Sequence, residues 1–220
     1  HGSHLDMLHH SPLGKGIAWE KDNVYWVFDG HHDAIVRYDF ATDHGAGGSY
    51  HGDGIVVRVV DGLVSDVSGL PSHLYFEHAT GRLFIANTGN STISVLETQG
   101  FNVDTENLSA IGFSPAGPNY ETSTQGVSTQ LTLTTLVDGT ANDVSMTRPS
   151  GLHLHNNNII VSDNQSGTIF AFDSTTGALV DYLPLGQLAQ DIMGVVTDFE
   201  GNLYVVDSTG NQVLRISVKS

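Results

Sequence analysis

Histidine is the residue type of this chain that could most directly carry out chemistry. The sequence has 12 His among 220 residues and contains no Cys. Neutral imidazole is a common ligand of zinc and copper, and most His side chains are neutral at pH 7. Eight of them crowd into the first 51 positions, as His1, His4, His9, His10, His31, His32, His44 and His51. Without Cys there is no thiolate metal site and no haem attachment motif.

A pattern that occurs four times indicates which elements must position these histidines. Each copy has a short apolar run, an Asp or Asn 12 to 14 residues after its start, and then a second apolar run. The copies start at Gly16, His73, Gly151 and Gly194, and their Asp or Asn residues are Asp29, Asn87, Asp163 and Asp207. A fixed long-range period indicates one supersecondary unit that repeats and packs on its neighbours.

Each copy is a succession of short β-type runs separated by turns. In the last copy, Leu203–Val206 is rich in β-branched and aromatic residues, Asp207–Asn211 is a turn, and Gln212–Val218 alternates apolar and polar residues. Strands of this length and spacing predict an all-β chain with a β-propeller fold. The repeated Asp or Asn is expected to be structural, because it can start an Asx-type turn by accepting hydrogen bonds from nearby backbone N–H groups.

The pattern resembles the NHL-repeat family of β-propellers, most closely at Pro149-Ser-Gly-Leu and at Val161-Ser-Asp-Asn. The resemblance covers residues 14–96 and 149–217 and implies that the four recognisable blades belong to a six-bladed ring. We expect one domain over 1–220, with blades near 12–66, 69–138, 149–182 and 190–220. A polar insertion at about 100–147 would contain the outer strand of the second blade, Gln130–Val137. We also expect that blades are missing before residue 1.

The propeller arrangement would bring distant imidazoles together on one face. We call this the top face: it holds the start of each inner strand and the loop between the second and third strands. His31 and His32 occupy that loop in the first blade, and His73 replaces a residue that is Gly in the other copies. With His4 and His9, they predict a metal site at the channel mouth. Alternatively, His73 only hydrogen-bonds backbone across the channel.

Whether His4 is a native residue stays open at this point. His1-Gly-Ser-His4 looks like the remnant of a cleaved affinity tag. Leu5–His10 continues from it without a break, however, and the run resembles a segment found in some bacterial NHL-like proteins.

A second metal candidate is the Gly-rich loop from Asp43 to Gly54, which contains Asp43, His44, His51 and Asp53. Carboxylates with backbone carbonyls suit calcium, whereas two His side chains suit zinc. The loop should lie on the bottom face, where it would join the third and fourth strands of the first blade. The alternative is a Gly-rich hairpin loop capped by Asp.

The remaining polar residues of interest lie in strands and loops. His153 and His155 should pack against neighbours or line the channel, and His10 and His78 should be solvated. The top-face loops predict a binding surface that joins His31 and His32 to Thr88, Asn90, Asn164, Gln165, Ser208 and Asn211.

Charge narrows the classes of partner. There are 24 acidic residues against 8 basic ones, which gives a net charge of −16. Such a surface disfavours nucleic acids and anionic membranes, and no apolar run approaches the length of a membrane span. Together with the absence of Cys and the processed-looking start, the composition favours a secreted or periplasmic protein.

Three functions remain open. The first is a non-catalytic binding or scaffold module for a protein, glycan or peptide ligand, with zinc, calcium or copper as a possible cofactor. The second is a metal-dependent lyase or hydrolase, because the chain distantly resembles the peptidylglycine-amidating lyase family, whose zinc is held by His of inner strands. Only His73, two residues after Pro71, approximates that pattern, and no acidic residue occupies an inner-strand start as in calcium-dependent lactonases. The third is a structural subunit of an extracellular assembly.

Overall fold

The protein is all-β. The computed structural model describes residues 10–43, 45, 52–111, 123–141 and 144–217. Over these ranges sixteen strands form four sheets, and the one helical element is a three-residue 3-10 turn, η1 (Thr88–Asn90). Within the same ranges, none of the helical structure is long and apolar enough to cross a lipid bilayer.

We call the four sheets blades 1 to 4, and all strands except β8 follow one another through them in chain order. Blade 1 contains β1 (Gly14–Lys21), β2 (Val24–Asp29), β3 (Ala34–Asp39), β4 (Ile55–Val59) and β8 (Thr124–Ser128). Blade 2 contains β5 (Leu74–Glu77), β6 (Arg82–Asn87), β7 (Thr92–Glu97) and β9 (Leu133–Asp138). Blade 3 contains β10 (Pro149–His155), β11 (Asn158–Asp163), β12 (Thr168–Asp173) and β13 (Leu179–Pro184). Blade 4 contains β14 (Ile192–Thr197), β15 (Leu203–Asp207) and β16 (Gln212–Ile216).

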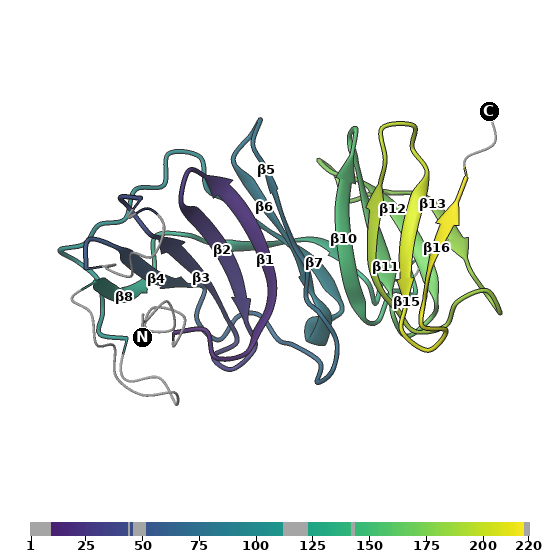
Figure 1. Ribbon diagram of the computed structural model, residues 1–220, viewed down its shortest axis with the longest axis horizontal. Helices are drawn as coiled ribbons and strands as arrows, with labels where there is room; N and C mark the ends of the chain where they lie inside the picture. Colours follow the sequence, from purple (N-terminus) through teal and green to yellow (C-terminus); the bar gives the residue numbers. More distant parts are fainter. Residues whose placement is uncertain (1–9, 44, 46–51, 112–122, 142–143, 218–220) are drawn as a thin grey trace.

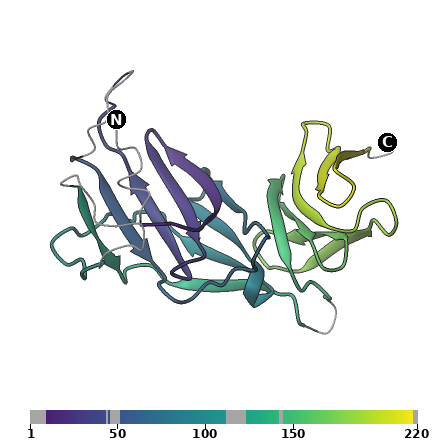
Figure 2. The ribbon, with the colours of Figure 1, turned by 60° about the horizontal axis from the view of Figure 1, so that its bottom comes forward.

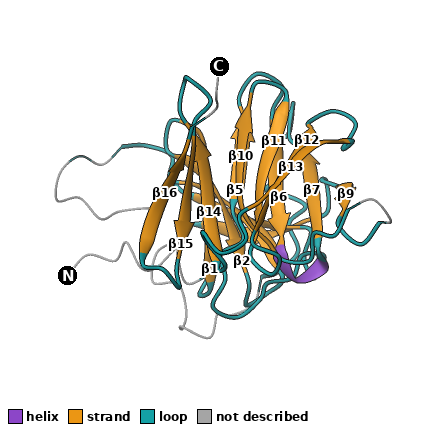
Figure 3. Ribbon diagram, turned by 90° about the vertical axis from the view of Figure 1, so that its right-hand side faces the viewer, coloured by secondary structure: helices purple, strands orange, loops and turns teal. Residues whose placement is uncertain are grey.

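The blades stand side by side in an open arc, with blade 1 at one end and blade 4 at the other (Figure 1, Figure 2). The innermost strands β1, β5, β10 and β14 contact one another in that order. Seen from the blade 4 end, the strand axes of successive blades lie roughly parallel to one another (Figure 3). The all-β propeller prediction is therefore confirmed, whereas the six-bladed ring stays a prediction.

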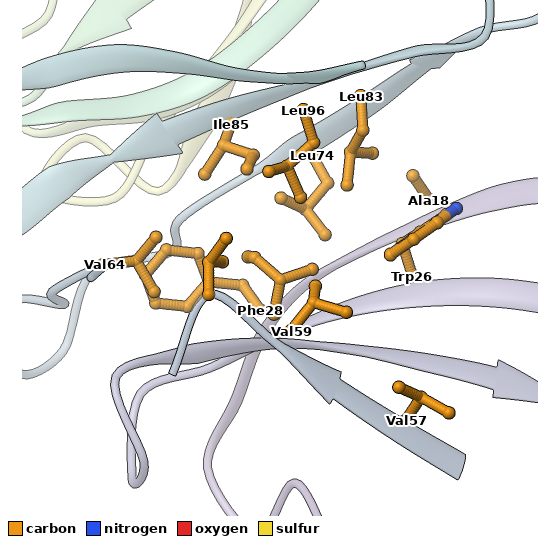
Figure 4. Packing of buried hydrophobic residues seen from close by; sticks show 12 residues of the cluster. Ala18, Trp26, Phe28, Val57, Val59, Val64, Leu74, Leu83, Ile85 and Leu96 are labelled. Carbon is orange, nitrogen blue, oxygen red and sulfur yellow. The ribbon is translucent and has the colours of Figure 1, made fainter. Parts of the chain in front are cut away.

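Hydrophobic side chains hold the arc together between blades. Between blades 1 and 2, Trp26 and Phe28 of β2 lie beside Leu83 and Ile85 of β6 (Figure 4). A second cluster joins blade 2 to blade 3, and a third joins blade 3 to blade 4 through residues such as Ile169. Middle strands such as β2 and β6 are buried almost throughout, so they present buried side chains on both faces.

Glycine allows the inner strands to approach closely. A Cβ atom on Gly16 would stand 2.1 Å from the carbonyl oxygen of Ser72, at the contact between blades 1 and 2. On Gly151 it would stand 2.5 Å from the Cα atom of Gly194, between blades 3 and 4. No larger side chain fits at these two positions unless the backbone shifts, which explains the Gly that begins most copies of the repeat.

The repeated Asp or Asn ties each blade to the loop that leads into it. Asp29 Oδ1 accepts a hydrogen bond from Leu13 N at 3.4 Å, and Asn87 Oδ1 accepts one from Ser65 N at 2.8 Å. Asp163 Oδ1 accepts one from Thr147 N at 3.0 Å. All of these Asp and Asn side chains are buried, as is Asp207. These contacts therefore confirm the structural role that was expected for this position.

The insertion that follows β7 contains more β-structure than the sequence indicates. The outer strand predicted over Gln130–Val137 is present as β9, which pairs antiparallel with β7. The same insertion also supplies β8, which adds to blade 1 by pairing parallel with β4. Expecting the rest of the insertion to be a surface loop was wrong for Thr124–Ser128, a segment that is too polar and too short to stand out as a strand.

Candidate functional site: a polar pocket between blades 3 and 4

The top face exists as the repeat predicts. Antiparallel pairing places Pro149 opposite Asp163 in blade 3 and Ile192 opposite Asp207 in blade 4. The start of each of these inner strands therefore lies beside the end of the second strand, next to the loop that follows it. These loops are held at one end of rigid sheets, which is where binding residues commonly occur.

A pocket of about 400 Å³ opens on this face between blades 3 and 4. It is lined by Arg148, Asn164, Gln165, Ser166, Gly186, Ala189, Gln190 and Asp191. Arg148 precedes β10, the residues from Asn164 to Ser166 form the turn between β11 and β12, and the others belong to the connection from β13 to β14. The lining thus combines one guanidinium group, one carboxylate, three amides and a hydroxyl group.

Asp163 fixes the blade 3 side of the pocket. Its Oδ1 atom accepts hydrogen bonds from the backbone N–H groups of Thr147 and Arg148, and its Oδ2 atom accepts one from Ser166 N at 3.1 Å. Because the Asp163 carboxylate is buried, these bonds hold Arg148 and Ser166 in place. The turn is further tied to Arg148 by the bond from Asn164 N to its carbonyl oxygen, at 3.0 Å.

The blade 4 side is held by contacts to the loop after β15. Thr209 Oγ1 donates a hydrogen bond to Asp191 Oδ2 at 2.5 Å, and Ser208 N donates one to the Asp191 carbonyl oxygen at 3.0 Å. The side chain of Gln212 bridges this wall by donating to Asp207 Oδ2 and to the Leu188 carbonyl oxygen. The hydrogen bond from Gln212 is the main reason that the pKa of Asp207 lies below its usual range. The loop is therefore positioned before any ligand arrives.

The predicted binding residues divide into two groups. Gln165 lines the pocket, and Ser208 contacts it through Asp191. Thr88 is fully buried, with its Oγ1 atom donating to the Pro149 carbonyl oxygen at 2.7 Å, and Asn164 is buried with its Nδ2 atom 3.4 Å from the Ile192 carbonyl oxygen. Both side chains thus connect adjacent blades. The buried Thr88 side chain therefore does not belong to an open binding surface, whereas Asn164 also lines the pocket and its binding role stays a prediction.

Two further predicted binding residues, Asn90 of blade 2 and Asn211 of blade 4, are exposed. Asn90, in η1, donates to the Leu63 carbonyl oxygen at 3.4 Å, and Asn211 has a left-handed backbone with φ 50° in the turn before β16. Reasoning from the sequence missed Arg148, Gln190 and the lining role of Asp191. Only the position of Asp191 just before Gly194 hinted at the last of these.

The histidines of the first metal candidate do not converge in the part of the chain that the structure describes. The His31 and His32 rings meet edge to face, with centroids 4.6 Å apart, and His32 Nδ1 lies 2.5 Å from Asp29 Oδ2. No group of three or more His, Asp and Glu side chains among the described residues could hold a metal ion, so His73 does not complete such a site with them. His4 and His9 lie outside the described residues, and the metal site stays a prediction.

His73 instead packs across the inner ends of the blades. Its backbone N–H donates to the Ser150 carbonyl oxygen at 3.2 Å, and its ring lies against Gly194 of blade 4. Burial lowers the pKa of this imidazole below its ordinary value of 6.5. His73 also lines a cavity of about 610 Å³ beside β1. These contacts favour the alternative interpretation, in which His73 makes a structural contact across the channel.

The second metal candidate joins β3 to β4 as expected. Asp53 Oδ2 accepts a hydrogen bond from Thr42 N at 3.2 Å, and Asp43 Oδ1 accepts one from Gly45 N at 3.0 Å. These contacts are those of a loop capped by Asp. His44 and His51 lie outside the described residues, so the metal role of this loop also stays a prediction.

The other histidines have packing roles. The His153 ring meets Tyr75 of blade 2 edge to face at 5.3 Å, and His155 Nδ1 lies 3.1 Å from Thr197 Oγ1 of blade 4. Burial is the main cause that lowers the pKa of His153. His78 is exposed as expected, but His10 is buried, which corrects the expectation that it is solvated.

Comparison with known proteins identifies the fold. No protein-family model and no curated protein matches the chain. A solved chain from the nidogen/laminin complex aligns over 93% of this chain and 60% of its own length, with 14% identity and a TM-score of 0.58. An auxiliary nutrient binding protein from Bacteroides ovatus aligns over 94% and 48%, with 14% identity and a TM-score of 0.57. Glutaminyl cyclase from Myxococcus xanthus aligns over 94% and 66%, with 11% identity and a TM-score of 0.50.

These similarities define the class to which the fold belongs. The similar structures are β-propellers, so this chain has a β-propeller fold and the expected propeller resemblance is confirmed. The chain spans between about half and two thirds of the length of these solved chains. At 11–14% identity the similarity shows the fold alone, because propellers support unrelated functions.

Proposed function

We propose that this chain is a binding module whose ligand site is the top-face pocket between blades 3 and 4. The observation that carries the proposal is the lining itself. Arg148, Gln165 and Asp191 offer donors and acceptors within one pocket of about 400 Å³, and buried Asp163 and Asp207 hold its walls. A site that is organised before binding loses less conformational entropy when the ligand arrives.

The lining favours a polar peptide as the ligand. Arg148 can pair with a carboxylate and Asp191 with an ammonium group, while the amides of Gln165 and Gln190 can bond both groups of a peptide unit. None of the residues that line this pocket is aromatic, so it offers no ring for a sugar to stack on. A peptide or protein partner is therefore preferred to a glycan.

The names of the similar structures include proteins with a binding role, but they do not assign one function to the fold. One belongs to a complex of nidogen with laminin and another is a nutrient binding protein, whereas a third is a cyclase. We carry the binding role over to this chain as part of the proposal, together with the secreted or periplasmic location that its composition favours. No contact among the described residues specifically favours a metal-dependent lyase or hydrolase.

A displayed library of random linear peptides, selected on the immobilised protein, tests the proposal. Selected peptides should lose at least tenfold in affinity for the double variant Arg148→Ala, Gln165→Ala. Thr132→Ala, an exposed substitution just before β9 of blade 2, is the matched control and should bind as the unmodified protein does. Failure to enrich any peptide, or equal binding by the double variant, would overturn the proposal. Retention of glycans from an array in place of peptides would overturn the choice of ligand.

A further inference from the structure

Another pocket opens between blades 1 and 2 on the bottom face, opposite the top face. Its volume is about 440 Å³, and pockets of roughly 300–1,000 Å³ commonly bind small molecules. It is lined by the end of β1, the turn between β5 and β6, and the segment that follows β7. The turns after β1 and β5 lie at the same end of their sheets (Figure 1). We call this cavity the bottom pocket.

Aromatic rings line part of the bottom pocket. Phe76 of β5 and Phe101 of the segment after β7 both belong to the lining, and both are half-buried against the apolar cluster between blades 1 and 2. The Phe101 ring lies 6.3 Å from the buried ring of Trp26, and the Phe76 ring meets His78 edge to face at 5.2 Å. The core therefore holds both phenyl rings from behind, while part of each stays accessible.

A carboxylate is fixed beside these rings. Glu20 lines the bottom pocket, and its side chain is only 14% exposed. Arg37 donates to it twice, from Nε to Oε2 at 2.8 Å and from Nη2 to Oε1 at 3.2 Å. The guanidinium group of Arg37 is itself held over the ring of Trp26, at 5.8 Å. Because an ionised carboxylate has about four lone-pair sites, Glu20 can still accept hydrogen bonds from a ligand.

The segment after β7 adds amide groups on a tethered backbone. The N–H and Oγ1 of Thr98 both donate to the Gly81 carbonyl oxygen, at 2.8 Å and 2.7 Å, and Phe101 N donates to the Thr98 carbonyl oxygen at 2.9 Å. These bonds tie the segment to the turn between β5 and β6. Gln99 and Asn102 are exposed and line the bottom pocket, so their side-chain amides can both donate to and accept from a ligand.

Charge favours a neutral ligand. The described lining contains the carboxylate of Glu20 and the ammonium group of Lys21, which lie 3.9 Å apart. The Glu20 carboxylate is also neutralised by Arg37. A cationic ligand would therefore meet no uncompensated negative charge here. An acidic ligand would be repelled by the chain as a whole, which carries a net charge of −16.

We propose that the bottom pocket binds a neutral sugar. The apolar C–H face of the sugar ring packs on Phe76 and Phe101, and its hydroxyl groups donate to Glu20 and bond the amides of Gln99 and Asn102. A sugar suits this pocket because it joins an apolar ring face to a rim of hydroxyl groups without a charge. The site is separate from the top-face pocket, whose lining has no aromatic ring, and goes beyond the function proposed for that pocket.

An array of neutral and uronate-containing oligosaccharides, probed with the purified chain, tests the proposal. Neutral oligosaccharides should be retained and acidic ones should not. A retained sugar is then titrated while tryptophan fluorescence is followed. The chain has two Trp residues, and both contact the lining: Trp19 lies 5.0 Å from the ring of His78, and Trp26 lies behind Phe101. Retention of no neutral sugar, or a preference for acidic sugars, would overturn the proposal.

Protein variants locate the sugar. The double variant Gln99→Ala, Asn102→Ala changes only exposed side chains and should weaken sugar binding at least about tenfold. Its matched control is Asn107→Ala, an exposed Asn of the same insertion that does not line the pocket. Phe101→Leu keeps an apolar side chain against Trp26 but removes the ring, and it should also weaken binding at least about tenfold.

Two further variants complete the comparison. Phe40→Leu changes a half-buried Phe of blade 1 outside the bottom pocket and should bind the sugar normally. The top-face variant Arg148→Ala, Gln165→Ala should also bind the sugar normally, so that failure here is distinguishable from failure of the proposed function. Undiminished binding by Phe101→Leu or by the amide double variant would overturn the proposal, and so would loss of binding in the top-face variant.

Discussion

The imidazole of His73 lies against the backbone of Gly194, so that a side chain from blade 2 reaches the inner strand of blade 4. A Cβ atom on Gly194 would stand 3.1 Å from His73 Cε1, which is closer than most side-chain contacts. Blade 3 lies between these two blades in the arc. The contact therefore links non-adjacent blades near the axis, and the ionisation of His73 bears on their packing.

Stability should fall as the pH decreases through the range in which these histidines titrate. Burial lowers the pKa values of His73 and His153 in the folded protein, so between those values and about 6.5 the unfolded chain binds more protons. The stability that the neutral rings contribute is fully present above pH 6.5 and is lost as the pH falls below it. Urea unfolding from pH 8 to pH 5 should show a decreasing free energy of unfolding.

The variant His73→Gln separates this effect from packing. At pH 8, where the histidines are neutral, its difference from the unmodified protein reports packing alone. Between pH 7 and pH 5 its stability should fall less steeply. Identical slopes for the two proteins would show that His73 does not contribute to the pH dependence.

Gly151→Ala should destabilise the protein by about 1–3 kcal/mol, because the added methyl group meets backbone atoms of blade 4. The nearest of these are Gly194 Cα at 2.5 Å and Val195 N at 2.7 Å. Gly14→Ala is the matched control, since its Cβ atom would meet Val27 Cγ1 at an ordinary 3.7 Å. Thermal and urea unfolding should separate the two variants, and equal stability would contradict the close approach of β10 and β14.

Asp163→Ala should cost about 3 kcal/mol or more, because it leaves buried backbone N–H groups without an acceptor. Asp173→Ala is the control: its carboxylate also accepts bonds from the N–H groups of Thr175 and Thr176, but in an exposed turn where water can replace it. Urea unfolding should show a clearly smaller loss for Asp173→Ala. A similar loss of stability in both variants would show that burial of Asp163 does not increase the cost of removing its carboxylate.

Arg82→Ala should loosen the contact between blades 2 and 3. The guanidinium donates to the Ser174 carbonyl oxygen at 2.8 Å, pairs with Glu77 and stacks over Phe84 at 4.9 Å. Removing these contacts should lower the free energy of unfolding by about 1–3 kcal/mol. Arg82→Lys should recover only part of that loss, since Lys lacks the planar guanidinium group of Arg. Lys21→Ala, which removes an exposed pair with Glu20, should change the free energy of unfolding by less than about 1 kcal/mol. Full recovery of the stability by Arg82→Lys would contradict the role given to the planar guanidinium group.

The repeat predicted the blades because each copy depends on local requirements that a sequence displays. Gly16 and Gly151 are needed for close approach, and Asp163 is needed to hold a loop. The polar pocket was only partly predictable, since Gln165 follows from the repeat but Arg148 reaches the site through packing of a separate loop. Thr88 was misplaced for a related reason: a polar residue in a top-face turn can bond across blades as readily as it can face solvent.

The path of the chain through β8 affects which parts of the molecule can unfold independently. After the third strand of blade 2 the chain returns to blade 1 and then comes back to complete blade 2, so neither of these sheets can detach while the other stays intact. Blade 4 has no such crossing in the described residues and follows blade 3 through one short loop. The N-terminal half should therefore behave as one cooperative unit, and amide protons of the C-terminal blade should be the first to exchange with solvent.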